Sequence, residues 1–190
     1  MAAQPSRETA PGYLRRLAAE AYQGTSFVHW TVSMQARSKG WLTPEFHLRW
    51  RELHLHALAR ETLCCPVYCL MPDHAHLLWV GSQPGSDQRR AMRLLRRWWG
   101  QALGAAWKLQ KQGFDHVLRP KERDIAAFES VATYILENPV RAGLVQDWKR
   151  WPYSGCLVPG HADLKVRAPD YWPRFWRTWT AQVSEHALHP

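Results

Sequence analysis

The sequence predicts an α+β protein in which helices pack on one face of a largely antiparallel sheet. Segments with strand and helix periodicity follow one another in the order strand, helix, two strands, helix, strand, helix. Two consecutive strands are joined by a tight turn, and no glycine-rich phosphate-binding loop is present. This combination fits an α+β sandwich better than a doubly wound parallel fold.

Four strands are predicted where β-branched and aromatic residues lie between turn-forming residues. They cover residues 26–32, 66–71, 74–80 and 114–119. The second and third strands are separated only by Pro72 and Asp73, which suit a tight turn.

Three helices are predicted between and after these strands. The first begins at Thr43, an N-cap that precedes Pro44, and ends at about residue 63. The second covers residues 87–112, with one apolar side and one strongly cationic side. The third covers residues 125–137, because the residue before a proline disfavours helical conformation.

Composition and length predict one main domain at residues 26–150 of the 190-residue chain. Residues 1–25 form a polar N-terminal extension, and residues 151–190 form a tail rich in tryptophan and proline that either packs or faces DNA. The four cysteines have neither zinc-ribbon nor disulfide-framework spacing, so we expect them to be reduced and buried.

The charge balance favours a polyanionic partner. The formal net charge is +9, and the basic residues are mostly arginine, which binds phosphate bidentately and stacks on bases. Charge alone does not identify a fold or a reaction. The sequence has no apolar signal core near its start and no apolar run of about 18 residues, so we expect a cytoplasmic protein without a membrane partner.

Two histidines on the third predicted strand are candidate metal ligands. His74 and His76 are two residues apart, and such residues point to the same face of a strand. His54 and His56 have the same spacing, but they lie in the first predicted helix and point about 200° apart, so they cannot chelate one ion. An isolated His-x-His is more often one core histidine beside one surface histidine than a metal site.

A tyrosine and an asparagine at the end of the third helix form the second candidate element. Tyr134 and Asn138 are four residues apart, so a phenol and an amide oxygen can approach the same ion or phosphate. Ordinary amphipathic packing for Tyr134, and helix capping before Pro139 for Asn138, are the more common roles of such residues.

These motifs together resemble the REP-associated tyrosine transposases, a group within the single-tyrosine HUH transposases. Residues 71–78, MPDHAHLL, resemble the HUH motif, and residues 134–145, YILENPVRAGLV, resemble the helix that carries the nucleophile. FDHVLR at residues 114–119 and WPYS at residues 151–154 also lie where that family has similar stretches.

The resemblance implies a ferredoxin-like or RRM-like sheet with the histidines on a central strand. It implies that His74 and His76 bind a divalent metal, Mg or Mn, and that Tyr134 attacks the scissile phosphate to leave a 5′-phosphotyrosine and a free 3′-hydroxyl. Asn138 matches the position of a third ligand, for which Glu137 competes. The implied partner is single-stranded or hairpin DNA near short palindromes, bound by a monomer, with a dimer left open.

DNA contacts are expected from the cationic side of the second helix, with tryptophans such as Trp98 stacking on unpaired bases. The candidate DNA-binding residues are Arg89, Arg90, Arg93, Arg96 and Arg97. A solvated cationic face and core tryptophans are the competing interpretations.

Three other functions compete with a transposase. A domesticated DNA-binding protein would keep the fold without the chemistry, although the chain retains His74, His76 and Tyr134. A replication initiator or relaxase would share the HUH logic, but the chain has no attached helicase region. A two-histidine phosphoesterase would need a second His-x-Ser/Thr strand motif, and the only other His-x-His, at His54, lies in a predicted helix.

Overall fold

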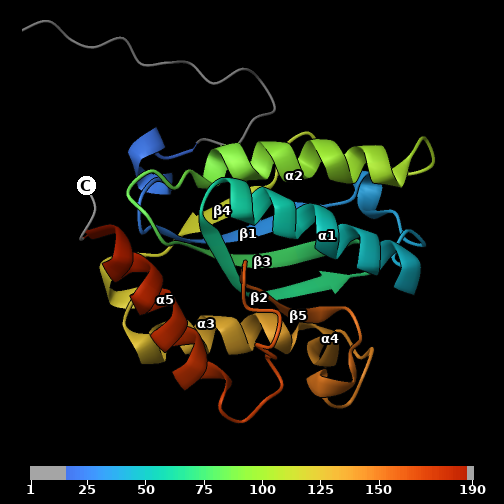
Figure 1. Cartoon of the computed structure of the whole chain (residues 1–190). Helices are drawn as coiled ribbons and strands as arrows, with labels where there is room; N and C mark the ends of the chain where they lie inside the picture. Colours follow the sequence, from blue (N-terminus) through green and yellow to red (C-terminus); the bar gives the residue numbers. More distant parts are fainter. Residues whose placement is uncertain (1–15, 188–190) are drawn as a thin grey trace, which may run out of the picture.

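A computed structural model describes residues 16–187 as a mixed α/β structure around one five-stranded sheet (Figure 1). The strands are β1 (Phe27–Ser33), β2 (Leu63–Met71), β3 (His74–Gly81), β4 (Phe114–Val117) and β5 (Ser154–Leu157). They lie in the order β4-β1-β3-β2-β5, and every neighbouring pair is antiparallel. The predicted α+β class is confirmed, and the strand that carries both histidines is the central one.

The described residues also form five α-helices and four short 3-10 helices. The α-helices are α1 (Pro44–Arg60), α2 (Gln88–Leu103), α3 (Ile125–Leu136), α4 (Asn138–Arg141) and α5 (Tyr171–Ala187). The 3-10 helices are η1 (Ala19–Tyr22), η2 (Gln35–Arg37), η3 (Pro120–Glu122) and η4 (Trp148–Arg150). None of the helices in the described part of the chain is long and apolar enough to cross a membrane.

Side-chain caps and a glycine determine where α1 and α2 begin and end. The Thr43 hydroxyl accepts a hydrogen bond from the Phe46 amide, and the Asp87 carboxylate accepts one from the Arg90 amide, as expected of N-caps. We expected the second helix to continue to residue 112, but α2 ends at Leu103. The following residue, Gly104, has a φ of 65°, which a helix cannot continue.

Helices cover both faces of the sheet, whereas we expected helices on one face. On one face, Trp30 of β1 and Trp79 of β3 pack in a core with α1 and α2. On the other face, Leu78 and Val80 of β3 pack in a second core with α3 and α5 (Figure 1). The physical reason is β2, whose residues are all buried, because a strand that is apolar on both sides needs cover on both sides.

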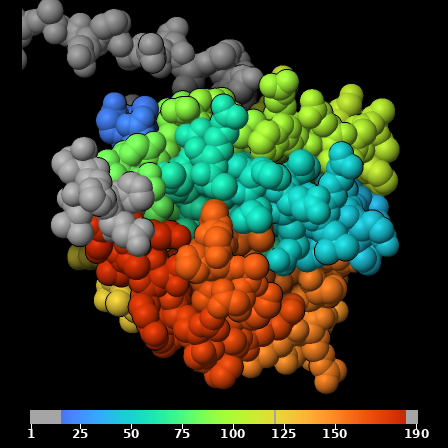
Figure 2. All heavy atoms as spheres, viewed as in Figure 1, coloured from blue at the N-terminus to red at the C-terminus, as the bar shows by residue number. Residues whose placement is uncertain are grey.

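The tryptophan-rich segment after residue 151 packs against the domain. We expected little regular structure there, but β5 pairs with β2 as an edge strand and α5 lies over the second core. The indole of Trp179 donates to the Gly81 carbonyl at 3.0 Å, and the ring of Trp176 contacts Phe128. In Figure 2 this orange-to-red segment forms a continuous surface with α1.

The four cysteines are buried and unpaired, as predicted. Burial raises the pKa of Cys64 and of Cys69 to about 12, so both thiols stay protonated at neutral pH. Cys69 lies on the same face of β2 as Met71 and contacts its sulfur at 3.8 Å. These side chains contribute to the second core as small apolar groups.

Buried His54 on α1 predicts a fall in stability on mild acidification. Its Nε2 accepts a hydrogen bond from the Trp79 indole at 2.9 Å, and burial, aided by the charge of Arg51, lowers its pKa to about 3. The unfolded chain therefore binds a proton below a pH of about 6.5 that the folded chain does not, so the free energy of unfolding falls as the pH falls from 6.5.

We expect His54→Gln, which keeps an acceptor for Trp79 but does not titrate, to reduce this dependence. Urea unfolding at pH 7 and pH 5 should show wild type losing about 2 kcal/mol more than the variant over this interval. Equal losses in the two proteins would show that folding does not lower the pKa of His54.

Candidate metal and nucleophile site

His74 and His76 project from the same face of β3 and bring two ring nitrogens together. Both lie on the face that carries Leu78 and Val80, which is the side covered by α3. Their Nε2 atoms are 3.0 Å apart. The two imidazoles therefore point to the same face of the strand, as their two-residue spacing predicts.

The outer nitrogen of His74 is held by a carboxylate. His74 Nδ1 lies 2.6 Å from Asp73 Oδ1, and the second oxygen of Asp73 accepts a hydrogen bond from Arg37 at 3.4 Å. Although partial burial opposes it, the hydrogen bond from His74 and the charge of Arg37 lower the pKa of Asp73. A charged carboxylate can only accept, so His74 carries a proton on Nδ1.

The Nδ1 nitrogen of His76 faces the neighbouring strand β1. His76 Nδ1 lies 3.0 Å from His29 Nε2 and 3.3 Å from the Thr31 hydroxyl, both on the neighbouring strand β1. Burial, followed by the charges of nearby groups, lowers the pKa of His76 to about 2. Burial and the charge of His116 likewise lower the pKa of His29 to about 4. Both rings are therefore neutral at physiological pH, as metal coordination requires.

The donor set fits a divalent ion between the two inner nitrogens. Neighbouring ligands of an octahedral ion with bonds of about 2.1 Å lie ~3.0 Å apart, and the His74 and His76 Nε2 atoms show this separation. The same distance suits a hydrogen bond between the rings. The contact between His74 Nδ1 and Asp73 is compatible with the ion, because a neutral ring with its proton on Nδ1 has its lone pair on Nε2.

Among the described residues, no group of three histidine, cysteine or acidic side chains is arranged to hold a metal. A third ligand would therefore come from an amide, a water molecule or the substrate. Asn138 is positioned as a helix cap, since its Nδ2 donates to the carbonyls of Tyr134 and Ile135 at 3.2 and 3.1 Å. Its competitor Glu137 is exposed and lies 3.8 Å from Arg141.

Tyr134 lies at the exposed rim of α3. Its side chain is 55% exposed, whereas Phe128 and Ile135 on the same helix are buried in the second core. The Arg141 guanidinium stacks on the Tyr134 ring, with its Cζ 3.9 Å from the ring centroid, and donates to the Tyr134 carbonyl at 2.6 Å. The phenol is therefore accessible and has a cation against its ring.

Arg141 connects the tyrosine to the histidines. Its charge contributes to the lowered pKa of His76, so the guanidinium lies within electrostatic range of both Tyr134 and the histidine pair. Tyr134 and the two histidines are thus on the same side of the sheet. The elements that carry the two sequence motifs, β3 and α3, pack together in the second core.

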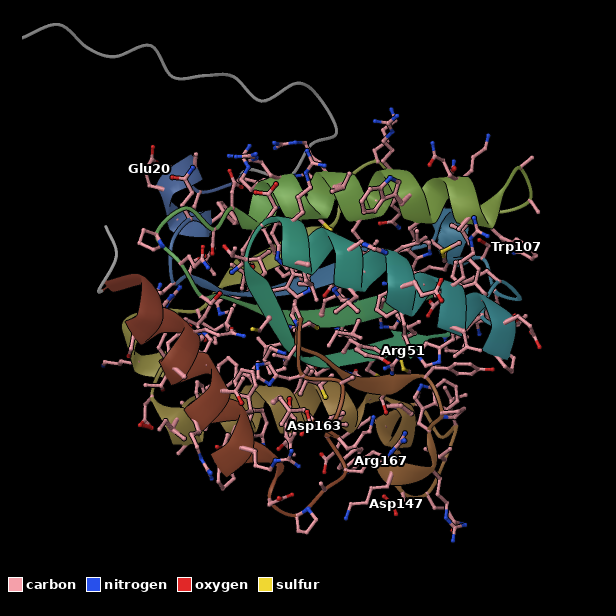
Figure 3. All side chains as sticks on the ribbon, in the orientation of Figure 1. Glu20, Arg51, Trp107, Asp147, Asp163 and Arg167 are labelled. Atoms are coloured by element: carbon pink, nitrogen blue, oxygen red, sulfur yellow. The ribbon has the colours of Figure 1, made fainter. Side chains whose placement is uncertain are left out.

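The five candidate arginines lie on α2, which covers the opposite face of the sheet. Arg90 forms an ion pair with Glu61 at 3.4 Å, and Arg89 lies over the ring of Tyr22. Arg96 is half-buried and donates to the Gln110 carbonyl. Arg93 and Arg97 are exposed, and neither has a hydrogen bond or ion pair with another described residue. Side chains ending in nitrogen project from the outer side of α2 (Figure 3).

Sequence reasoning missed His29, Thr31, Asp73 and Arg141. Asp73 and Arg141 lie inside the two motifs that were recognised, so their positions beside His74 and after Tyr134 were available signals. His29 and Thr31 lie on β1 with the alternation of a strand, but only the pairing of Thr31 with His76 places them at the site. That register comes from tertiary structure.

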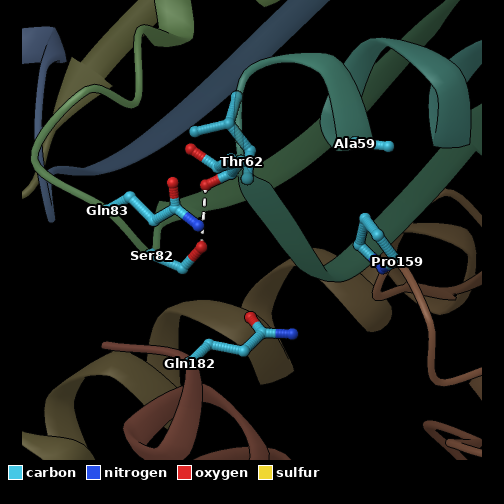
Figure 4. A pocket seen from close by; sticks show the side chains of 7 residues that line it. Ala59, Thr62, Ser82, Gln83, Pro159 and Gln182 are labelled. Atoms are coloured by element: carbon cyan, nitrogen blue, oxygen red, sulfur yellow. Dashed lines mark hydrogen bonds between the residues drawn. The ribbon is translucent and has the colours of Figure 1, made fainter. Parts of the chain in front are cut away.

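A separate surface hollow lies at the other end of the sheet (Figure 4). Thr62, Ser82 and Gln182 contribute polar groups, and Pro159 and Ala59 contribute apolar surface. The Ser82 hydroxyl donates to the Thr62 carbonyl at 2.9 Å. No lining residue of this hollow is titratable, so it lacks the groups that the site on β3 provides.

Comparisons with known proteins support the resemblance. No protein-family model matches the chain. A Haemophilus influenzae protein named "Putative REP-associated tyrosine transposase" is 28% identical over 167 residues, which span 77% of this chain and 84% of that protein. A solved structure of a REP-associated tyrosine transposase bound to a REP hairpin superposes with a TM-score of 0.63 at 21% identity, covering 75% of this chain and 81% of the other. The chain is thus similar in sequence and in fold to the REP-associated tyrosine transposases.

Proposed function

We propose that this protein is a metal-dependent single-stranded DNA endonuclease and transposase that cleaves and rejoins DNA near palindromic hairpins. One observation carries the proposal: two histidine Nε2 atoms converge 3.0 Å apart on the side of the sheet where Arg141 holds the exposed Tyr134. The relative from Haemophilus influenzae and the hairpin-bound structure support hairpin DNA as the substrate class.

The proposed chemistry is a phosphoryl transfer to Tyr134. The phenol oxygen attacks the scissile phosphorus, a bond from tyrosine oxygen to phosphorus forms, and the bond to the 3′ oxygen breaks. The phenol loses its proton and the departing 3′ oxygen gains one, which leaves a 5′-phosphotyrosine and a free 3′-hydroxyl. Attack by a 3′-hydroxyl on the phosphotyrosine reverses the step and rejoins the strand.

His74 and His76 would hold the metal, with the amide oxygen of Asn138 as the third protein ligand. When bound, Mg or Mn would polarise the phosphate. A phenol, whose pKa is ordinarily about 10, is a poor nucleophile near neutral pH and therefore needs a polarised phosphate to attack. Asp73 orients His74, and Arg141 orients the Tyr134 ring through its contacts with both ring and backbone. The Arg141 cation also attracts the DNA phosphate toward the phenol.

The DNA would contact a second surface through the exposed arginines of α2. Arg93 and Arg97 are the members of the predicted set that are free to bind phosphate, whereas Arg90 and Arg96 have partners within the protein. Trp98 packs against the first core, so stacking on a base is not the role that its position favours. A domesticated DNA-binding protein would keep this surface and lose the covalent chemistry.

Metal binding should depend on the strand histidines and not on the helical pair. We expect His74→Ala and His76→Ala each to weaken Mn²⁺ binding at least tenfold, measured by electron paramagnetic resonance of free Mn²⁺. His56→Ala is the matched control, because His56 is exposed on α1 and belongs to the other His-x-His. Unchanged affinity in both strand variants would place the metal elsewhere.

Covalent attachment should depend on Tyr134. Incubation with labelled single-stranded hairpin DNA and Mg²⁺ or Mn²⁺ should give a protein–DNA adduct that survives denaturation, and Tyr134→Phe should abolish it. Tyr153→Phe, a partly buried tyrosine packed against the first core, should leave it unchanged. Tight hairpin binding without any adduct would favour the domesticated binding protein.

The α2 arginines should contribute electrostatically to DNA binding. We expect the double variant Arg93→Gln/Arg97→Gln to bind hairpin DNA more weakly and to reduce the slope of log affinity against log salt by about 1 to 2, since each phosphate contact contributes about 0.9. Arg174→Gln is the control, because that guanidinium is paired with Asp163 and Asp170. An unchanged slope in the double variant would exclude Arg93 and Arg97 from the phosphate contacts.

A further inference from the structure

A third histidine continues the row across the sheet. His29 on β1 lies with its Nε2 3.0 Å from His76 Nδ1, and the two ring centroids are 5.2 Å apart. We propose that His29 is a positioning residue that accepts a hydrogen bond from His76 and so fixes the tautomer with which His76 presents Nε2. This inference rests on the proposed function in one respect, which is that a metal ion binds His76 Nε2.

The position of the single proton on each neutral ring determines which nitrogen can bind an ion. A neutral imidazole has one N–H and one lone pair. If His29 Nε2 accepts, His76 carries its proton on Nδ1 and its lone pair on Nε2, directed at His74 Nε2. If His29 donates instead, His76 carries the proton on Nε2 and cannot bind an ion there. The direction of this one hydrogen bond therefore decides whether the site is competent.

Asp73 gives His74 the same support on the other side. Its carboxylate lies 2.6 Å from His74 Nδ1, so both inner nitrogens present lone pairs only if His29 acts toward His76 as Asp73 acts toward His74. The Thr31 hydroxyl, at 3.3 Å from His76 Nδ1, is a weaker second acceptor. His29 and Thr31 both reach His76 because β1 pairs with β3 in the register Thr31↔His76.

Neighbouring groups leave His29 free for this role. His116 lies opposite His29 on β4, but its Nε2 is 2.9 Å from Glu122 Oε1. His76 is buried and His29 is half-buried, so access of water to the hydrogen bond between them is restricted. Among the described residues, His29 and Thr31 are the side-chain hydrogen-bond partners of His76 Nδ1.

The test compares three substitutions of His29 in the full chain. His29→Gln places an amide oxygen where Nε2 lies and can still accept, whereas His29→Leu removes the acceptor and His29→Asn has too short a side chain to replace it. His54→Leu is the control, because His54 is another buried, hydrogen-bonded histidine but belongs to the opposite core. Circular dichroism and thermal unfolding identify variants that still fold.

Two readouts are used, and the first needs no metal. Long-range ¹H–¹⁵N spectra of the metal-free protein report which nitrogen of His76 is protonated. We expect the Nδ1–H form in wild type, His29→Gln and His54→Leu, and a mixture of forms in His29→Leu and His29→Asn. The second readout is Mn²⁺ affinity, which should fall about ten- to a hundredfold in His29→Leu and be restored in His29→Gln.

The outcomes separate this inference from the proposed function. An Nε2–H form of His76 in the wild type, or equal tautomers and equal Mn²⁺ affinities in wild type and folded His29→Leu, would overturn the role of His29. Wild-type protein that shows the Nδ1–H form but binds no Mn²⁺ would overturn the metal-dependent function while leaving His29 as the residue that fixes the His76 tautomer.

Discussion

The alternation of side chains on β3 is the constraint on which the site depends. His74 and His76 share one face with Leu78 and Val80, while Trp79 points into the opposite core. Because β3 pairs with a strand on each side, a slip of one residue would break two ladders and exchange the side chains that enter the two cores. The register that stabilises the two cores therefore also fixes which side of the sheet carries the histidines.

Packing of α3 in the second core also fixes the position of Tyr134. Phe128 and Ile135 anchor α3 in the core above the histidine-bearing face, and Tyr134, next to Ile135 on the helix, emerges at the rim. An attacking phenol has to meet a polyanionic strand, so a rim position serves better than a buried one. Arg141 restricts the ring at this exposed position, where packing alone would leave it free.

Sequence patterns were sufficient where the interaction was local. Strand alternation and helix spacing predicted the His74 and His76 pair, the helix of Tyr134 and four of the five strands. β5 was missed because four residues at an edge have little periodicity of their own and are stabilised by pairing with β2. His29 was missed for the same reason, since 47 residues separate it from the partner that its strand places 3.0 Å away.

The two sides of the histidine pair are supported by different chemistry, and burial explains the difference. Toward solvent, His74 is held by the charged chain of Asp73 and Arg37, and Arg37 lies in a turn where both it and Ala36 have positive φ values of 53° and 52°. A positive φ at a residue other than glycine costs about 1 to 2 kcal/mol. The surrounding structure must therefore hold Arg37 in this conformation, and the hydrogen bond from the Met34 amide to the Asp73 carbonyl is part of it. Toward the interior, a second ion pair would have to be desolvated at high cost, and a neutral histidine can perform the same orienting role without that cost.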